Sequence, residues 1–143
     1  MKKHLLIFLA AALPFTLLAQ VPKKGPLDGQ TYTVDITKDG KKKPMDPDDF
    51  KFAAAKFKCK SFENYGFKSA GPYKIASIDS SNASAKVYSW TATMTNDIKD
   101  VINWTGTING EDIEGTSELV TSKGETKFTY TFSGKLKAKP GKK

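Results

Sequence analysis

Hydrophobic and polar residues alternate along most of the chain after residue 30. Tyr32, Val34 and Ile36, for example, are separated by the polar residues Thr33 and Asp35. A period of two residues is typical of β-strands that place one face in a core and the other face in solvent. The pattern therefore predicts an all-β domain of about eight short strands, with no convincing helix beyond the N-terminal segment.

The clearest predicted hairpin lies in the C-terminal part of the chain. Ile102 and Trp104 belong to an alternating segment that ends at the dipeptide Asn109-Gly110. Asn-Gly is the preferred dipeptide for a two-residue hairpin turn, because both of its residues tolerate a positive φ. We therefore predict a tight turn at Asn109-Gly110 that joins strands near 101–108 and 113–120.

Short antiparallel strands at even spacing favour a closed up-and-down barrel, with a β-sandwich as the alternative architecture. Gly106, Gly115 and Gly134 fall on the face that we expect to point inward, where glycine relieves crowding or lets a strand bend. The segment 41–47 contains two prolines and is expected to be a polar excursion between strands. The segment Ala53–Ala55 fits either a tight connection or one helical turn.

The first residues have the composition of an export signal. Lys2 and Lys3 precede an apolar run that is too short for a comfortable membrane span, and Ala19 offers a small residue at its end. We therefore expect residues 1–19 to be a signal peptide that is cleaved after Ala19. The mature protein would begin at Gln20 and would be exported to the periplasm or to the cell exterior.

Beyond the cleavage site, the composition divides the chain into three parts. We expect a flexible lead segment at 20–28, a barrel domain at 29–136 and a basic tail at 137–143. The net charge of +8 is concentrated at the two ends of the chain. A solvated tail is the ordinary interpretation, and weak, salt-sensitive attraction to anionic components of the cell envelope is the alternative. Because the chain contains no arginine, we expect no specific binding of nucleic acid.

The side chains available for chemistry exclude several classes of enzyme. Cleavage of the signal peptide would remove His4, the only histidine, and so would exclude nucleophilic triads, Cys–His pairs and histidine-rich zinc sites. We expect no catalytic residue, no cofactor and no metal; an enzyme would have to use carboxylates or tyrosines. Asp46, Asp48 and Asp49 lack the spacing and the glycine of a calcium loop, and they are expected to form a solvated acidic loop.

The single cysteine cannot form an internal disulfide bond. Cys59 alternates with lysines in the segment 56–60, so that Phe57 and Cys59 share one face of the strand and the lysines share the other. This pattern predicts a buried and unreactive thiol.

The aromatic residues are the one feature that indicates a ligand. We expect five of them to point into the barrel and take these as candidate ligand-binding residues: Trp90, Trp104, Phe128, Tyr130 and Phe132. Small barrels either fill their interior with side chains or hold one small ligand. Both interpretations stay open at this point, a packed core and a cavity for a small apolar or aromatic molecule.

Two groups of motifs resemble a family pattern. The first is Asp49-Phe50-Lys51-Phe52, Lys56-Phe57-Lys58-Cys59, Tyr65-Gly66-Phe67 and Pro72-Tyr73; the second is Trp104–Gly110, Ile113–Thr116 and Phe132–Leu136. Together they are similar to a group of small exported bacterial proteins of unknown function with a lipocalin-like (calycin-like) barrel, over about residues 28–136. The resemblance implies that fold and provides no functional residues. The segment Ala53–Ala55 departs from the glycine-containing turn that we would expect there.

Two functional hypotheses follow from these observations. In the first, the protein is an exported, non-catalytic, monomeric barrel that binds a small apolar ligand in its interior. In the alternative, it is a structural or interaction protein of the cell envelope, with a filled barrel and a basic tail.

Overall fold

The computed structural model describes residues 24–138 of the 143-residue chain, and their strands close into one antiparallel barrel. The expected signal peptide, residues 1–19, lies outside the described residues. Each strand pairs with the next one along the chain, and the last strand pairs with the first. The predicted up-and-down barrel is thereby confirmed, and the alternative of a sandwich is wrong.

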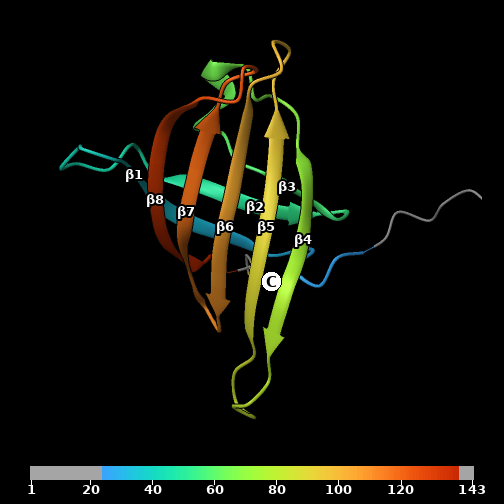
Figure 1. Ribbon diagram of the computed structural model, residues 1–143. Helices are drawn as coiled ribbons and strands as arrows, with labels where there is room; N and C mark the ends of the chain where they lie inside the picture. The colour runs from blue at the N-terminus through green and yellow to red at the C-terminus, as the bar shows by residue number, and fades with distance from the viewer. Residues whose placement is uncertain (1–23, 139–143) are drawn as a thin grey trace, which may run out of the picture.

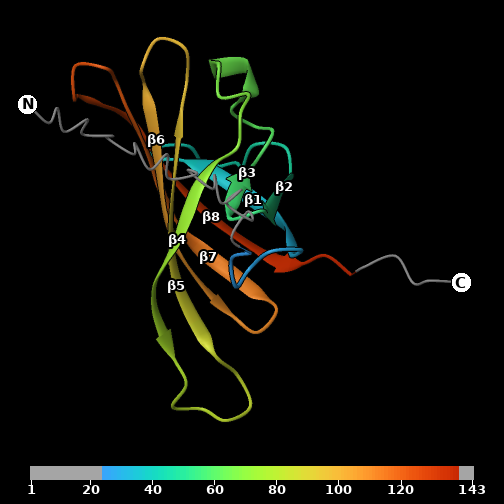
Figure 2. The same ribbon diagram turned by 90° about the vertical axis from the view of Figure 1, so that its right-hand side faces the viewer.

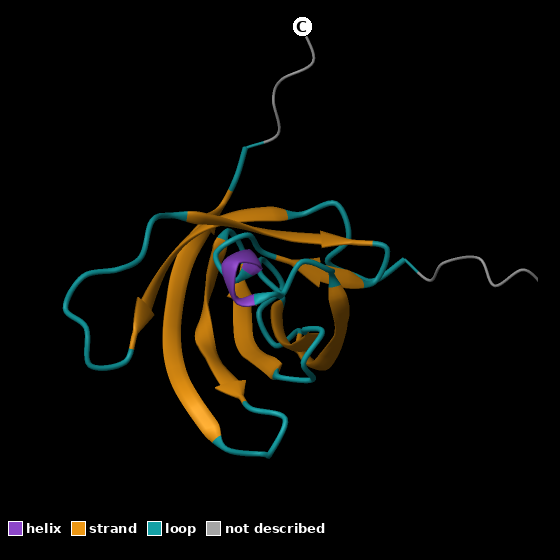
Figure 3. Ribbon diagram, turned by 90° about the horizontal axis from the view of Figure 1, so that it is seen from above, coloured by secondary structure: helices purple, strands orange, loops and turns teal. Residues whose placement is uncertain are grey.

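Eight strands form the barrel (Figure 1). In chain order they are β1 (Thr31–Lys38), β2 (Asp48–Ala53), β3 (Lys56–Lys58), β4 (Gly71–Asp79), β5 (Val87–Thr95), β6 (Val101–Asn109), β7 (Asp112–Val120) and β8 (Thr126–Leu136). A short 3-10 helix, η1 (Glu63–Tyr65), is the one helical element of the described residues. Figure 3 shows that η1 lies over the upper opening of the barrel.

The strands run in two main directions. Figure 1 shows β4 to β7 nearly upright and side by side, whereas β1, β2 and β3 cross behind them. The curved strand β8 connects the two groups, because it pairs with both β7 and β1. This crossing closes the barrel around a narrow interior that side chains can fill.

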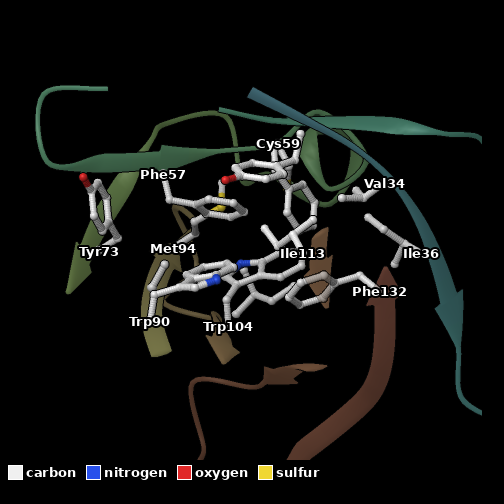
Figure 4. Close-up of a cluster of buried hydrophobic side chains, with 14 of the residues drawn as sticks. Val34, Ile36, Phe57, Cys59, Tyr73, Trp90, Met94, Trp104, Ile113 and Phe132 are labelled. Carbon is white, nitrogen blue, oxygen red and sulfur yellow. The ribbon is translucent and has the colours of Figure 1, made fainter. Parts of the chain in front are cut away.

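The interior is occupied by buried apolar side chains from every strand (Figure 4). On β6, for example, Ile102, Trp104 and Ile108 are buried, whereas Asn103 and Thr105 are exposed. The predicted alternation of buried and exposed positions is therefore confirmed. Full burial of each large apolar side chain contributes about 1.5–3 kcal/mol to stability, so this core is the main source of folding free energy.

Glycine makes room at the centre of the barrel, as predicted. Gly106 and Gly115 are cross-strand neighbours on β6 and β7. A Cβ atom on Gly115 would lie 2.6 Å from the Cα atom of Gly106 and 2.7 Å from the Cζ atom of Phe132. Both distances are far shorter than a normal carbon–carbon contact. The Phe132 ring can therefore lie over these strands only because side chains are missing there.

The hairpin between β6 and β7 forms as predicted, but its turn is shifted along the chain. Asn109 pairs with Asp112, so the two-residue loop is Gly110-Glu111 rather than Asn109-Gly110. Gly110 has a φ of +60°, and Glu111 does not have a positive φ. A positive φ at the first central residue alone is the sign pattern of a type II′ turn, which favours glycine at that position. The Asn-Gly dipeptide thus located the hairpin without fixing its register.

The packed domain begins earlier than the composition suggests. Leu27, which we expected in the flexible lead segment, is fully buried and belongs to the core. The backbone N–H of Gly29 donates to the carbonyl of Phe52, which ties this segment to β2. Figure 2 shows the segment, in blue, at the lower side of the barrel. The chain is therefore part of the fold from Gly25 onward, because Leu27 supplies apolar surface to the core.

The hairpin between β2 and β3 is closed by alanines in the left-handed backbone conformation. Ala53 pairs with Lys56, which leaves Ala54 and Ala55 as the loop, with φ values of 52° and 57°. This connection is a tight turn and not a helical turn. A left-handed conformation costs a residue with a Cβ atom about 1–2 kcal/mol, so the turn stores strain that surrounding contacts must offset.

Replacement of Ala55 by glycine should stabilise the protein. Glycine adopts a positive φ without a steric cost. It also increases the entropy of the unfolded chain, which offsets part of the gain in stability. We therefore expect Ala55→Gly to raise the free energy of unfolding by about 0.5–1 kcal/mol, measured by urea denaturation. Ala83→Gly, in an exposed loop where φ is not positive, is the matched control and should give no gain. A loss of stability in Ala55→Gly would contradict the turn geometry.

Candidate functional site

The barrel interior brings together most of the candidate ligand-binding residues. Trp90 and Trp104 are fully buried, and Tyr130 and Phe132 are almost fully buried. The ring of Phe132 lies 6.0 Å from that of Trp90 and 5.7 Å from that of Trp104, centroid to centroid. Figure 4 shows these three side chains within the core. Phe128 is only partly buried and packs at the margin of the core.

Phenylalanines from β2 and β3 complete the aromatic cluster, and we did not predict them as site residues. The ring centroid of Phe50 lies 5.1 Å from that of Trp104, and the centroid of Phe57 lies 5.3 Å from that of Trp90. Edge-to-face and tilted arrangements of this kind are favourable for aromatic pairs. Alternation placed both phenylalanines on strands, but it does not say which strands face each other across a barrel.

Polar atoms without a hydrogen-bond partner lie inside this apolar cluster. They are the indole Nε1 atoms of Trp90 and Trp104 and the hydroxyl Oγ atom of Ser117. Ser117 is the cross-strand neighbour of Trp104. An unpaired buried polar group costs about 1–3 kcal/mol. These atoms therefore have hydrogen-bonding capacity that a polar atom of a small ligand would use.

A second candidate site lies on the outer surface, where β2 and β3 carry lysines. Lys51 and Lys58 are direct cross-strand neighbours, and Lys51 also lies opposite Thr31 of β1. The backbone N–H of Lys137, just after β8, donates to the carbonyl of Thr31. A row of positions thus crosses the sheet with lysines at Lys58, Lys51 and Lys137. We call the surface formed by Lys51, Lys58, Lys60 and Lys137 the lysine face.

Depressions in the surface flank Lys51 on both sides. One has a volume of about 320 Å³ and extends to Lys58 and Lys60. The other has a volume of about 550 Å³ and extends to Lys137. Because Asp49 and Lys51 line both depressions, the two form one strip across the lysine face. Figure 2 shows the end of β8 emerging on the side of the barrel where β2 and β3 lie.

The carboxylates near the lysine face neutralise only part of its charge. Asp49 accepts a 2.9 Å hydrogen bond from Lys137 Nζ, which holds the pKa of Asp49 below its usual range. Glu63 lies 3.6 Å from Lys58 Nζ. Within the described part of the chain, Lys51 forms no ion pair. The face therefore keeps positive charge that is available to an external anion.

The acidic residues around the start of β2 form only in part the solvated cluster that the sequence predicts: Asp46 is exposed, but Asp48 is not. Asp48 is buried, and its carboxylate accepts hydrogen bonds of 2.9 Å and 2.6 Å from the backbone N–H groups of Lys60 and Ser61. Asp48 therefore holds the chain that leaves β3 against the start of β2. Among the described residues, no group of three or more His, Cys, Asp or Glu side chains is placed to hold a metal ion.

Cys59 lies in the same corner of the barrel and is buried, which confirms its predicted position. Burial and the negative charge of Asp48 both raise the pKa of the Cys59 thiol. Since the thiolate is the reactive form of cysteine, this environment disfavours nucleophilic chemistry at Cys59.

The outer face of β6, β7, β8 and β1 has a different character. Depressions of about 610 Å³ and 720 Å³ cross it, and they are lined mainly by hydroxyl and carboxylate side chains. A cross-strand row on this face consists of Thr105, Thr116, Thr131 and Thr37. Threonine is common on exposed strand faces because β-branched side chains fit a pleated surface. This face therefore provides hydrogen bonding without chemistry that is specific for one ligand.

Comparisons of the chain with protein-family models, with curated proteins and with solved structures found no match. None of the helices in the described segment has the length and hydropathy needed to cross a membrane. The fold and the surface define a closed, eight-stranded antiparallel barrel with an aromatic core and a lysine-bearing outer face.

Asp28 ties the entering chain to two other parts of the barrel. Its carboxylate accepts hydrogen bonds from the Gly25 N–H at 2.8 Å, the Ala55 N–H at 3.1 Å and the Tyr73 hydroxyl at 2.8 Å. Burial alone would raise the pKa of Asp28, but the Tyr73 hydroxyl and the backbone donors outweigh burial and lower it. Burial and the contact with Asp28 raise the pKa of Tyr73, which therefore stays a protonated donor.

Replacement of Asp28 by asparagine should destabilise the protein and change its response to acid. The variant Asp28→Asn loses a charged acceptor for three donors, so we expect a loss of about 1–3 kcal/mol at pH 7. Because the pKa of Asp28 is lower in the folded chain than in the unfolded chain, its contribution is complete above the unfolded pKa of about 4 and is lost as the pH falls through the folded pKa.

Urea denaturation at pH 7 and at pH 3 measures both effects. The difference in stability between the natural chain and Asp28→Asn should shrink at the lower pH. Asp97→Asn, at an exposed carboxylate that accepts no hydrogen bond within the described residues, is the matched control. An equal difference at both pH values would rule out an ionised Asp28 as the stabilising group.

Proposed function

We propose that this protein is an exported, non-catalytic interaction protein of the cell envelope that binds anionic polymers through its lysine face. The cross-strand pair of Lys51 and Lys58 carries this proposal. Like charges directly opposite each other destabilise a pair of strands. A phosphate or carboxylate group bound between the two ammonium groups would offset that repulsion.

The first residue of the basic tail, Lys137, belongs to the lysine face. The chain leaves β8 beside Thr31, and Lys51 and Lys137 line one depression there. The sequence that follows adds Lys139, Lys142 and Lys143. Each lysine close to an anionic surface contributes about 1 kcal/mol of attraction, and salt screens this attraction over about 10 Å. A long anionic partner can contact the lysine face and the tail together, whereas a single small anion cannot.

The composition of the chain supports the other parts of the proposal. Export to the periplasm or the cell exterior rests on the N-terminal sequence, and the relationship to lipocalin-like proteins rests on the motifs quoted above. The absence of arginine favours loose, salt-sensitive binding over bidentate recognition of phosphate. A non-catalytic role is consistent with the loss of His4 on cleavage and with the engagement of Asp28, Asp48 and Tyr73 in structural hydrogen bonds.

The chain that begins at Gln20 should bind long-chain polyphosphate, with an affinity that falls steeply as salt is added. The double variant Lys51→Gln/Lys58→Gln should bind at least about tenfold more weakly at low salt, because each lysine contributes about 1 kcal/mol. Fluorescence anisotropy of labelled polyphosphate measures the affinity.

The control for this experiment is Lys86→Gln/Lys123→Gln, which removes the same charge from exposed loops outside the lysine face. Equal weakening by both double variants would mean that only net charge matters, and the proposed site would be refuted. Vesicles that contain phosphatidylglycerol are the second probe. If the protein bound these vesicles but not polyphosphate, the partner would be a lipid headgroup and not a polymer.

A small apolar ligand in the barrel is the second candidate function. The unpartnered indole N–H groups of Trp90 and Trp104 and the hydroxyl of Ser117 favour it, because a bound molecule with an acceptor atom would satisfy them. The surrounding rings would contact the apolar part of such a molecule. Phe128 lies at the margin of the core and would contact a ligand only near the rim of the barrel.

A hydrophobic probe such as anilinonaphthalene sulfonate should quench the emission of Trp90 and Trp104 if it enters the barrel. Trp104→Phe removes one indole N–H while keeping an aromatic ring, and it should weaken binding of the probe about tenfold. Deletion of residues 137–143 should leave the affinity for the probe unchanged. If saturating probe did not quench this emission, the interior would be a packed core that binds no ligand.

A further inference from the structure

The lower part of β4 is an open edge in the otherwise closed barrel. β4 pairs with β3 only at Gly71 and Pro72, and the Tyr73 N–H donates to the carbonyl of Ala55. From Lys74 to Asp79, β4 pairs with β5 alone within the described residues. Figure 1 shows the lower half of β4 without a strand on the side away from β5. The unpaired backbone groups of such an edge are able to pair with another strand.

Apolar side chains lie beside this open edge. Ile78 is 51% exposed, although its cross-strand neighbour Tyr88 packs against the core. Ile75 is partly buried and also packs against the core. The inner side of the hairpin of β4 and β5 thus has an apolar surface that no described residue covers completely. An exposed apolar surface next to an open strand edge is typical of a site that accepts an added strand.

We propose that a second copy of this chain occupies the open edge, with one β4 strand paired antiparallel to the other about a two-fold axis. The edge sequence Lys74-Ile75-Ala76-Ser77-Ile78-Asp79 is complementary to itself in this arrangement. With the axis between Ala76 and Ser77, Lys74 of each copy lies opposite Asp79 of the other copy. Ile75 then lies opposite Ile78, and a two-fold interface contains each of these pairs twice.

A bulge in β4 places the paired side chains on matching faces. The register with β5 shifts between Ile75 and Ser77, so that Ile75 and Ile78 both lie opposite inward-facing aromatic residues of β5. Lys74 and Asp79 are exposed on the outward face. In a regular strand, residues three apart point to opposite faces. The bulge therefore allows the apolar pair and the charged pair to form together.

The expected dimer is weak. Stable interfaces bury about 1,200–2,000 Å² in total, which is more than one short strand edge with its side chains supplies. We therefore expect a dissociation constant between micromolar and millimolar. We expected a monomer from the sequence, and the monomer stays the dominant form at low concentration. This inference does not depend on the proposed binding of anionic polymers.

Sedimentation velocity of the chain that begins at Gln20, over concentrations up to about 1 mM, tests the proposal. Either single variant, Lys74→Asp or Asp79→Lys, places like charges opposite each other at both ends of the interface. Because opposed like charges repel, each variant should weaken dimerisation at least tenfold. The double variant Lys74→Asp/Asp79→Lys restores opposite charges and should recover the dissociation constant of the natural chain.

Lys123→Asp is the matched control, because it reverses a charge in the exposed turn between β7 and β8 without changing the open edge. It should leave dimerisation unchanged. Near-UV circular dichroism should be the same for all variants, since the substituted side chains are exposed. Hydrogen exchange at the backbone amides of Lys74–Asp79 should slow as the concentration rises, while exchange in β6 stays constant.

Three results would overturn the proposal. One is a chain that stays monomeric over the whole concentration range. Another is a dimer that neither single reversal weakens or that the double reversal fails to recover, because the contact would then lie elsewhere. The third is protection of Lys74–Asp79 that is independent of concentration, because another part of the same chain would then cover the edge.

Discussion

The packing of large aromatic rings inside a small closed barrel is the constraint on which the rest of the structure depends. A Cβ atom on Gly106 would lie 3.0 Å from both the Phe132 Cζ atom and the Trp90 Nε1 atom, so the rings fit only where a strand has no side chain. The one cysteine is unpaired, and no disulfide stabilises the fold. The burial of these rings must therefore supply most of the free energy of folding.

The apolar packing of the interior also decides which polar groups hold the barrel together and which remain available for binding. Asp28 and Asp48 each accept hydrogen bonds from backbone N–H groups of segments that are distant in the sequence. These carboxylates hold the chain at two places where the pairing between strands is interrupted. Their negative charge strengthens the hydrogen bonds that they accept there. The ammonium groups of Lys51 and Lys60 do not hold distant segments of the described chain together. The outer face of β2 and β3 is therefore the best candidate for contact with an anion.

Features that depend on neighbouring residues could be predicted from the sequence, and features that depend on distant contacts could not. The two-residue alternation located the strands and the buried side of Trp90, Trp104 and Cys59, because it is a local property of a half-buried strand. The burial of Asp48 depends on a contact with Lys60 across the end of a short hairpin, and the composition of its own loop suggested a solvated carboxylate. The open edge of β4 likewise depends on the short length of β3.

The lysine face and the open edge of β4 use different residues on different parts of the barrel. Figure 2 shows the lower half of β4 on the side away from β2 and β3. Occupation of one surface therefore does not block the other. A dimer formed through β4 would carry two lysine faces. A long anionic polymer bound to one face would meet the second face at a high effective concentration, so two weak contacts would replace one tight site. Weak attraction by lysines without arginine is then sufficient, because each face needs to bind only loosely.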